Sequence, residues 1–364
     1  MSSASQSHPR LARRGFVAAA TASVAALAAP ASARARRLGA ETIVGAGSHT
    51  YRVHHHFPQL PDRFTWQTTH GVALDAAGNL YVIHEGRRDR KDHPAIFVFD
   101  PQGAFVRAFG AQFQGGGHGI EVRKEADGEY LYVCGYQQVK AFAKLSLDGE
   151  IVWFRKAPME AGGYAADEDV STTRNWSRTG FLPTNVAFLD DGGFLLADGY
   201  GTYRIHRYDK EAKWLGSFGG VGPGKGTFNT PHGLWIDRRP GRDPAIVVTD
   251  RAHGTLQVFA LDGTYKETIP GFGLPANIDT LGGLMLVPEL KACVTLLDER
   301  NMVVARLGQA VKRLDAIKDL RTKPDQWRDG EFVHPHDACF SPAGDIFVAE
   351  WVEPGRVTRL EKIA

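Results

Sequence analysis

Six short phrases along the chain place a histidine or an asparagine directly before an apolar, strand-like run. Three of them read Gly117-His118-Gly119-Ile120, Pro231-His232-Gly233-Leu234 and Pro335-His336-Asp337-Ala338. The residues at the shared position are His70, His118, Asn185, His232, Asn277 and His336. Neutral imidazole is the commonest protein ligand of zinc and related metals. The series therefore indicates a metal site, provided that the fold brings these residues together.

The spacing of the phrases indicates the elements that position them. Successive shared positions lie 45 to 67 residues apart, and a four-stranded propeller blade needs ~40–45 residues. Apolar runs separated by glycine-containing turns, as at residues 75–79 and 341–345, are typical of antiparallel strands. Six repeats predict an all-β fold, a six-bladed β-propeller. The two longest spacings predict a polar loop over residues 157–180 that stands over one face, and a short amphipathic surface helix over residues 309–319 between blades five and six.

The first strand of each propeller blade lines the channel, so equivalent residues face the axis at one height. His118, His232 and His336 belong to repeats two, four and six, which lie a third of a turn apart. Three imidazoles converging on one axial point is the ligand set of a catalytic zinc site with an open fourth position. Asp337 follows His336 and should point to the opposite side of the strand, where a hard cation such as calcium could take it. The alternative is that Pro-His-Gly is only a turn whose histidine caps backbone groups.

Composition argues against two other classes of protein, those that bind nucleic acid and those that span a membrane. The formal charge of +2 in 364 residues gives no reason to expect nucleic acid binding, and no stretch after the N-terminus is long and apolar enough for a membrane span. Residues 1–35 read as an export signal, with Arg13-Arg14-Gly15 resembling the twin-arginine motif and Ala31-Ser32-Ala33 as a cleavage site. An ordinary secretory signal is the alternative. We therefore expect a periplasmic or secreted protein, with an N-terminal segment over residues 36–68 and the propeller over residues 69–364.

The repeats resemble the peptidyl-α-hydroxyglycine α-amidating lyase domain of peptide-amidating enzymes, an NHL-type propeller family. The resemblance runs from Thr69 to Lys362. It is carried by the histidine phrases above, in order and one per blade, and by 183–187, Ala197-Asp198-Gly199-Tyr200 and Thr249-Asp250-Arg251. It implies zinc at His118, His232 and His336. It also implies a structural calcium at the Asp337 carboxylate and the main-chain carbonyls of Val72 and Ile120, with Tyr200 as the general base and Arg251 lining the site.

Three departures from the family pattern bear on the substrate. Glu85 stands where the family has an arginine, and Arg87 or Arg88 are the basic residues nearby. His334 stands where the family has a methionine. His70 replaces a small residue in blade one, where it could add a metal ligand or alter the channel floor. The scaffold and the metal site match the family, whereas the substrate pocket does not.

The resemblance implies a zinc-dependent lyase that cleaves a carbinolamide-type C–N bond and yields an amide and a glyoxylate-like carbonyl product. Two alternatives stay open at this point. One is a metal-dependent hydrolase that attacks an ester or lactone with the same site. The other is a non-enzymatic NHL-type propeller whose loops bind a protein or glycan. We expect a small-molecule or peptide substrate and a monomeric protein.

Overall fold

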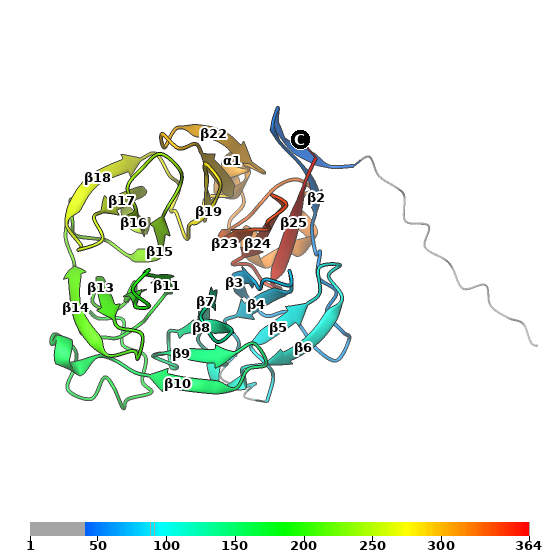
Figure 1. The fold of residues 1–364 in the computed structure, drawn as a ribbon. Helices are drawn as coiled ribbons and strands as arrows, with labels where there is room; N and C mark the ends of the chain where they lie inside the picture. The colour runs from blue at the N-terminus through cyan, green and yellow to red at the C-terminus, as the bar shows by residue number, and fades with distance from the viewer. Residues whose placement is uncertain (1–40, 88, 91, 364) are drawn as a thin grey trace, which may run out of the picture. The chain divides into compact units, whose positions relative to one another are not determined.

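The fold is known from a computed structural model, which describes residues 41–87, 89–90 and 92–363. The predicted export signal lies outside the described residues. Six antiparallel sheets stand around a central channel, and the strands nearest the axis are β3, β7, β11, β15, β19 and β23 (Figure 1). The predicted six-bladed β-propeller is confirmed. No helix in the described part of the chain is long and apolar enough to cross a membrane.

The blades follow the chain in order. Blade one comprises β3 (Thr69–Leu74), β4 (Leu80–His84), β5 (Ile96–Phe99) and β6 (Phe105–Phe109). Blade two comprises β7 (Gly117–Lys124), β8 (Glu129–Gly135), β9 (Ala141–Ser146) and β10 (Ile151–Arg155). Blade three comprises β11 (Asn185–Phe188), β12 (Phe194–Ala197), β13 (Arg204–Tyr208) and β14 (Trp214–Gly219). Blade four comprises β15 (Pro231–Asp237), β16 (Ala245–Asp250), β17 (Thr255–Phe259) and β18 (Tyr265–Pro270). Blade five comprises β19 (Asp279–Leu281), β20 (Leu284–Glu289), β21 (Cys293–Leu297) and β22 (Val303–Leu307).

Blade six joins the two ends of the described chain. Its inner strands are β23 (Pro335–Phe340), β24 (Ile346–Glu350) and β25 (Arg356–Lys362), and its outer strands are β1 (Ile43–Ala46) and β2 (His49–His54). β2 pairs with β25 in antiparallel register, with Tyr51 opposite Lys362. Part of the predicted N-terminal segment therefore belongs to the propeller, which it closes by pairing with the C-terminal strand.

The hydrophobic core consists of six clusters, one between each pair of neighbouring blades. Between blades two and three, for example, Phe142, Phe181 and Phe194 are fully buried. Apolar side chains on both faces of each sheet pack against the adjacent blades, which explains why the strands read as near-continuous apolar runs. This packing fixes the inner strands, and with them the axial residues.

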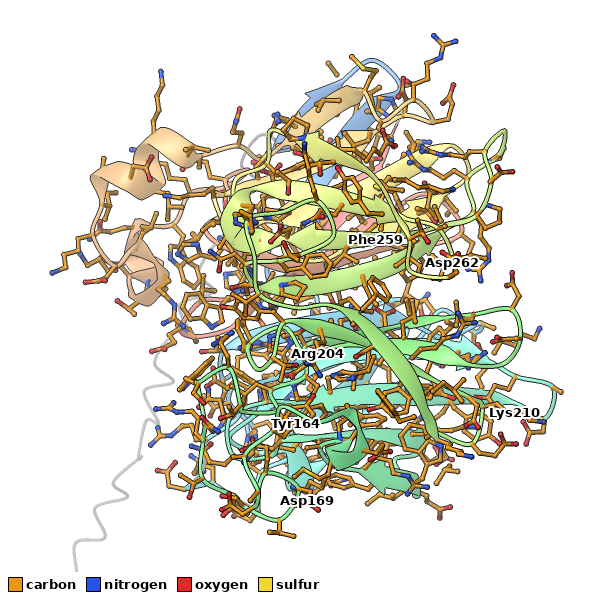
Figure 2. All side chains as sticks on the ribbon, turned by 90° about the vertical axis from the view of Figure 1, so that its left-hand side faces the viewer. Tyr164, Asp169, Arg204, Lys210, Phe259 and Asp262 are labelled. Carbon is orange, nitrogen blue, oxygen red and sulfur yellow. The ribbon has the colours of Figure 1, made fainter. Side chains whose placement is uncertain are left out.

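Both predicted insertions are present. The helix α1 (Val311–Ala316) and the short 3-10 turns at Leu320–Thr322 and Pro324–Gln326 lie between blades five and six and cover a small apolar cluster. The 157–180 loop lies between blades two and three. In Figure 2, Tyr164 and Asp169 of this loop lie toward the same end of the blades as Arg204, the first residue of β13. Lys210 and Asp262 mark turns at the other end (Figure 2). The loop therefore stands over the end at which the inner strands begin.

Candidate metal centre and active site

Each channel histidine sits at a β-bulge near the start of an inner strand. The pairing of β3 with β4 shifts register between Thr69 and Gly71, around His70. Equivalent shifts in β7, β15 and β23 surround His118, His232 and His336. A bulge leaves a residue out of the strand ladder and re-aims its side chain. The same local irregularity therefore turns four imidazoles toward one another.

The four rings form one buried cluster on the axis. The ring centroid of His336 lies 4.9 Å from that of His118, and His232 lies 4.7 Å from both. His70 lies 4.9 Å from His118 and 4.6 Å from His336. One ring nitrogen from each of His70, His118 and His336 lies within 4.8 Å of the other two. The structure thus gathers the three histidines predicted from alternate blades, and adds His70 to them.

Hydrogen bonds fix the tautomer of three of these rings. Nδ1 of His118 donates to the carbonyl oxygen of Thr184 at 2.8 Å, and Nδ1 of His232 donates to that of Ala276 at 2.7 Å. Nδ1 of His336 donates to the carbonyl oxygen of His70 at 2.8 Å. With the proton on Nδ1, each Nε2 carries a lone pair, which is the form that ligates metals. The Nε2 atoms of His118 and His232 lie only 3.1 Å apart, and two such lone pairs face each other favourably only with a cation between them.

Glycine permits these bonds. A Cβ atom at Gly119 would lie 2.3 Å from the carbonyl oxygen of Thr184, and one at Gly233 would lie 2.5 Å from the Cα atom of Asn277. The inner strands of neighbouring blades therefore approach closely only because these positions lack a side chain. That approach puts the carbonyl groups within reach of Nδ1. The site thus requires glycine after His118 and after His232, whereas His336 makes its bond with Asp337 in that position.

Burial keeps the three rings neutral. Removal from water lowers the pKa of His118, His232 and His336 well below the ordinary histidine range, and neighbouring charged groups lower it further. Metal ligation requires the neutral imidazole, so the ligands are already in the required form at neutral pH. The donor set fits zinc or another transition metal.

Tyr200 and Arg251 lie together beside this cluster. The ring of Tyr200 packs edge-on against His118 and His232, at centroid distances of 5.6 and 5.4 Å. Nη1 of Arg251 donates to the Tyr200 hydroxyl at 2.7 Å. Burial raises the pKa of Tyr200, and the guanidinium of Arg251 acts against that rise. The two residues that the family resemblance pointed to are therefore in contact with each other and next to the histidine cluster.

A cavity of about 380 Å³ opens above the histidines. Aromatic and charged side chains form its wall, and its lining includes His70, Glu85, Tyr136, Trp176, Tyr200, Arg251, Arg321, His336, Trp351 and Glu353. Trp176 comes from the 157–180 loop and lies 5.4 Å from Tyr200, centroid to centroid. Nε and Nη2 of Arg251 are buried without a hydrogen-bond partner in the described structure. Arg251, which lines this cavity, therefore carries two unsatisfied donors and contacts a tyrosine hydroxyl.

Below the histidines, the asparagines of blades three and five cross the channel. Nδ2 of Asn185 donates to Oδ1 of Asn277 at 2.8 Å, and Nδ2 of Asn277 donates to Oδ1 of Asp337 at 2.5 Å. A space of about 10 Å³ separates this chain of hydrogen bonds from the histidine rings. The two repeats that lack histidine at the shared position thus supply the floor of the site.

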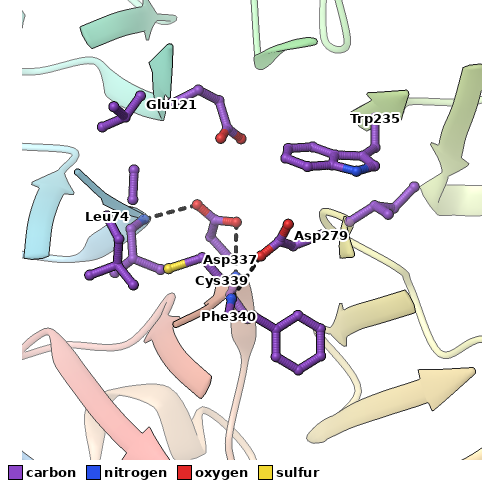
Figure 3. A pocket seen from close by; sticks show the side chains of 12 residues that line it. Leu74, Glu121, Trp235, Asp279, Asp337, Cys339 and Phe340 are labelled. Atoms are coloured by element: carbon purple, nitrogen blue, oxygen red, sulfur yellow. Dashed lines mark hydrogen bonds between the residues drawn. The ribbon is translucent and has the colours of Figure 1, made fainter. Parts of the chain in front are cut away.

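A second cavity, of about 180 Å³, lies on the side of Asp337 away from the histidine rings. Figure 3 shows the carboxylates of Glu121, Asp279 and Asp337 directed into it, beside Trp235. Burial raises the pKa of Asp337 to about 7 and that of Asp279 to about 6, and burial together with Asp337 raises that of Glu121 well above its usual range. Three carboxylates that are costly to ionise in one cavity suit a hard cation with oxygen ligands.

The calcium ligands predicted from the resemblance stay a prediction. Asp337 does contact Val72, but through the backbone N–H of Val72, which donates to Oδ2 at 2.9 Å. Oδ1 of Asp337 accepts hydrogen bonds from the Ala338 N–H and from Asn277. The carbonyl oxygens of Val72 and Ile120 have no described contact with this carboxylate. Glu121 and Asp279 are the further oxygen donors that the structure places there.

The remaining predicted residues separate into two groups. Glu85 belongs to the site: its Oε2 lies 3.3 Å from Nε2 of His70, and Gln137 donates to its other oxygen. His334 faces away from the cluster, since its Nδ1 donates to the Leu290 carbonyl at 2.6 Å and its ring packs on Trp351. Arg87 pairs with Asp89 on the surface and does not replace the missing arginine. Arg88 lies outside the described residues.

Sequence reasoning missed several lining residues. Arg321, just beyond the predicted surface helix, lines the upper cavity and stacks on Trp351, with its guanidinium carbon 3.6 Å from the ring centroid. Glu121 and Asp279 carried a usable signal, because each is an acidic residue on an inner strand two or three positions after a shared position. Trp351 follows the last inner hairpin and carried no such signal.

Comparison with known proteins supports the fold. No protein-family model matches this sequence, and no curated protein matches it. A solved gluconolactonase from Xanthomonas campestris is 14% identical, with 88% of this chain and 95% of that chain covered and a TM-score of 0.55. Virginiamycin B lyase from Staphylococcus aureus is 12% identical, with 86% and 100% covered and a TM-score of 0.52. A catalytically inactive variant of that lyase with quinupristin gives 12% identity, 85% and 100% coverage and a TM-score of 0.53.

These identities establish a shared propeller architecture and no more. None of the three solved structures is an amidating lyase, so the resemblance to that family rests on the sequence motifs alone.

Proposed function

We propose that this protein is a metal-dependent lyase that cleaves the C–N bond of a carbinolamide carrying an acidic group, as in a peptide ending in α-hydroxyglycine. One observation supports this most strongly. Three neutral histidines from alternate blades leave their Nε2 atoms free toward each other, next to the hydrogen-bonded pair of Tyr200 and Arg251. A structural turn has no need of this combination.

The Nε2 atoms of His118, His232 and His336 would hold the metal. A zinc ion bound there supplies Lewis acidity, which lowers the pKa of a hydroxyl group. The cavity above leads to His336 and His70, so a substrate oxygen has access to the cluster from that side. In this proposal Asp337, Glu121 and Asp279 hold a structural calcium ion below.

Tyr200 is the proposed general base. As a phenolate it accepts the proton of the carbinol hydroxyl, and the oxygen's electron pair forms the carbonyl bond while the C–N bond breaks. The phenol then returns the proton to the departing nitrogen, which leaves as the amide. Burial keeps the pKa of Tyr200 raised even with Arg251 beside it. The phenolate would therefore need the positive charge of a bound metal as well as the Arg251 guanidinium, which donates to the Tyr200 oxygen at 2.7 Å.

Arg251 also fits the substrate's acidic group. Its Nε and Nη2 hydrogens are buried without partners, which is costly unless a ligand accepts them. A carboxylate is the acceptor that matches a planar guanidinium in two places. Trp176 and Tyr136 pack around Tyr200 and shield this space from water.

The test uses chelator-stripped protein reloaded with zinc and a peptide ending in α-hydroxyglycine, with glyoxylate release as the measurement. The proposal expects release by the wild type and loss of both metal and activity in His232→Ala. Metal-loaded protein that releases no glyoxylate contradicts the lyase. Protein that binds no transition metal contradicts the metal centre, and favours a binding propeller.

An ester or lactone hydrolase is the second candidate, and Glu85 favours it. This carboxylate lines the upper cavity where the amidating family has an arginine, and so it weakens the attraction for an anionic substrate. The same cluster could activate a water molecule in place of a substrate hydroxyl. A panel of neutral esters and lactones separates the candidates, because metal-dependent cleavage of these without glyoxylate release identifies the hydrolase.

A further inference from the structure

His70 repeats the local geometry of the three proposed ligands. It occupies the shared position of blade one, on a register shift like the one around His336. It is 2% exposed, and its ring lies as close to His118 and His336 as these rings lie to each other. The cluster therefore contains four comparable imidazoles, of which the proposed metal site uses three.

The two nitrogens of His70 have different surroundings. Nε2 lies 3.3 Å from Oε2 of Glu85, and Glu85 is held in turn by Gln137. Nδ1 is buried and has no hydrogen-bond partner within the described residues. A buried imidazole nitrogen without a partner is costly. In the other three rings the roles are reversed, with Nδ1 bonded to a carbonyl and Nε2 directed at the cluster.

A role for Nδ1 as a substrate-facing base does not fit the orientation of the ring. Glu85 and His70 both line the upper cavity, and the nitrogen that contacts Glu85 is Nε2, so Nδ1 is on the other edge of the ring. Meanwhile a ring nitrogen of His70 lies within 4.8 Å of ligand atoms of His118 and His336. Glu85 stands where second-shell carboxylates orient metal-bound histidines.

We propose that His70 is a fourth imidazole ligand through Nδ1, held in place by Glu85, so that the ion is bound by four imidazoles. This inference rests on the metal centre of the proposed function. Four imidazoles would complete the usual set of four zinc ligands, and a substrate oxygen would then bind as a fifth ligand. An all-imidazole set suits zinc, copper, iron and nickel, and excludes magnesium and calcium as the resident ion.

The test measures zinc affinity by chelator competition and counts imidazole ligands by X-ray absorption of the zinc-loaded protein. The expected count is four in the wild type and three in His70→Ala. Loss of a carboxylate that orients a metal-bound histidine typically costs ~10–100-fold in metal affinity. We expect a loss of that order in Glu85→Gln and a larger one in His70→Ala. His334→Ala is the matched control, since this half-buried histidine is bonded to Leu290 away from the cluster, and the zinc affinity of the variant should equal that of the wild type.

The outcomes are distinct. A wild-type count of three, or a His70→Ala affinity equal to that of His334→Ala, overturns the fourth ligand; if His232→Ala still loses zinc, the proposed metal centre stands. Wild-type protein that binds no zinc overturns both. Circular dichroism checks that each variant is folded. Should His70→Ala not fold, the wild-type count and the Glu85→Gln affinity decide the question.

Discussion

At the scale of single residues, the tautomers of the channel histidines carry the chemistry. A backbone carbonyl oxygen accepts a hydrogen bond from Nδ1–H of each of His118, His232 and His336. The lone pair of Nε2 is then available to bind a cation. His70 lacks such a carbonyl and has Glu85 on its other nitrogen. The identity of the group behind each ring therefore decides which nitrogen faces the cluster.

Tyr200→Phe tests the proposed base. Removing the hydroxyl removes the proton acceptor while the ring keeps its packing against His118 and His232. General-base residues typically contribute ~10²–10⁴-fold, so turnover in glyoxylate release should fall by that order with zinc content unchanged. Tyr265→Phe, on an outer strand, should keep wild-type turnover. A Tyr200→Phe enzyme with full turnover excludes the phenolate mechanism.

Asp279→Asn tests the charge of the lower cavity. Burial raises the pKa of Asp279 from 3.8 to about 6, so the folded state keeps a proton that the unfolded chain has lost. Its contribution to stability is therefore complete below about pH 4 and is lost as the pH rises through about 6. In EGTA, the free energy of unfolding of the wild type should fall as the pH rises from 4 to 7. In Asp279→Asn this fall should be smaller by about 3 kcal/mol, because the variant lacks the titrating carboxylate.

Urea unfolding across this pH range measures the effect, and Asp243→Asn on the surface is the control. Glu121 and Asp337 face the same cavity, and their raised pKa values add pH dependence of the same sign in both proteins. Parallel pH profiles for the wild type and Asp279→Asn would refute the buried, protonated carboxylate.

At the scale of elements, the sequence predicts the inner strands, but it predicts only some of the loops and strands that pack around them. A polar residue before an apolar run recurs once per blade, and the propeller converts that recurrence into a ring around the axis. Arg321 escaped prediction because it lies in a short 3-10 turn after the helix, and the sequence does not show which part of the propeller that turn contacts. The pairing of β2 with β25 was not predicted, because the sequence of one short strand does not indicate which strand, some 300 residues away, it pairs with.

A buried ion pair holds the 157–180 loop against blade two, next to the site. Nζ of Lys140 lies 2.8 Å from Oε1 of Glu168, with exposed fractions of 0% and 2%, and the Phe181 N–H donates to the same oxygen. Breaking such a pair from one side typically costs ~3–5 kcal/mol, because the other charge stays buried without its partner. The pair therefore fixes the loop that carries Trp176 over the cavity.

Glu168→Ala should release this loop while leaving the metal ligands in place. We expect faster tryptic cleavage after Arg174 and Arg178, a raised KM for the carbinolamide and unchanged zinc affinity. Asp167→Ala, one residue away and exposed, is the matched control. Unchanged cleavage and KM in Glu168→Ala would show that the loop is held by other contacts.

At the scale of the whole molecule, the axial site depends on closure of the ring. Six inner strands define the channel only while the first and last blades stay in contact, and β2 secures this by pairing with β25. Tyr51 of β2 is 1% exposed and packs in the cluster between blades five and six, with Leu286, Leu307 and Leu360. The strand thus adds backbone pairing within blade six and core packing between blades five and six.

Tyr51→Ala should consequently weaken the whole propeller. Replacing a buried aromatic residue by alanine typically costs ~3–5 kcal/mol, through lost burial and the cavity left behind, and the free energy of unfolding should fall by about that amount. Ile43→Ala on β1, which is 43% exposed in the same hairpin, should cost far less. Because the histidines come from blades on both sides of the closure, zinc should be released at the temperature at which the sheets melt, in both the wild type and Tyr51→Ala. Zinc release in Tyr51→Ala well below its own melting temperature would instead show that the closure opens as a local event, with the rest of the ring still folded.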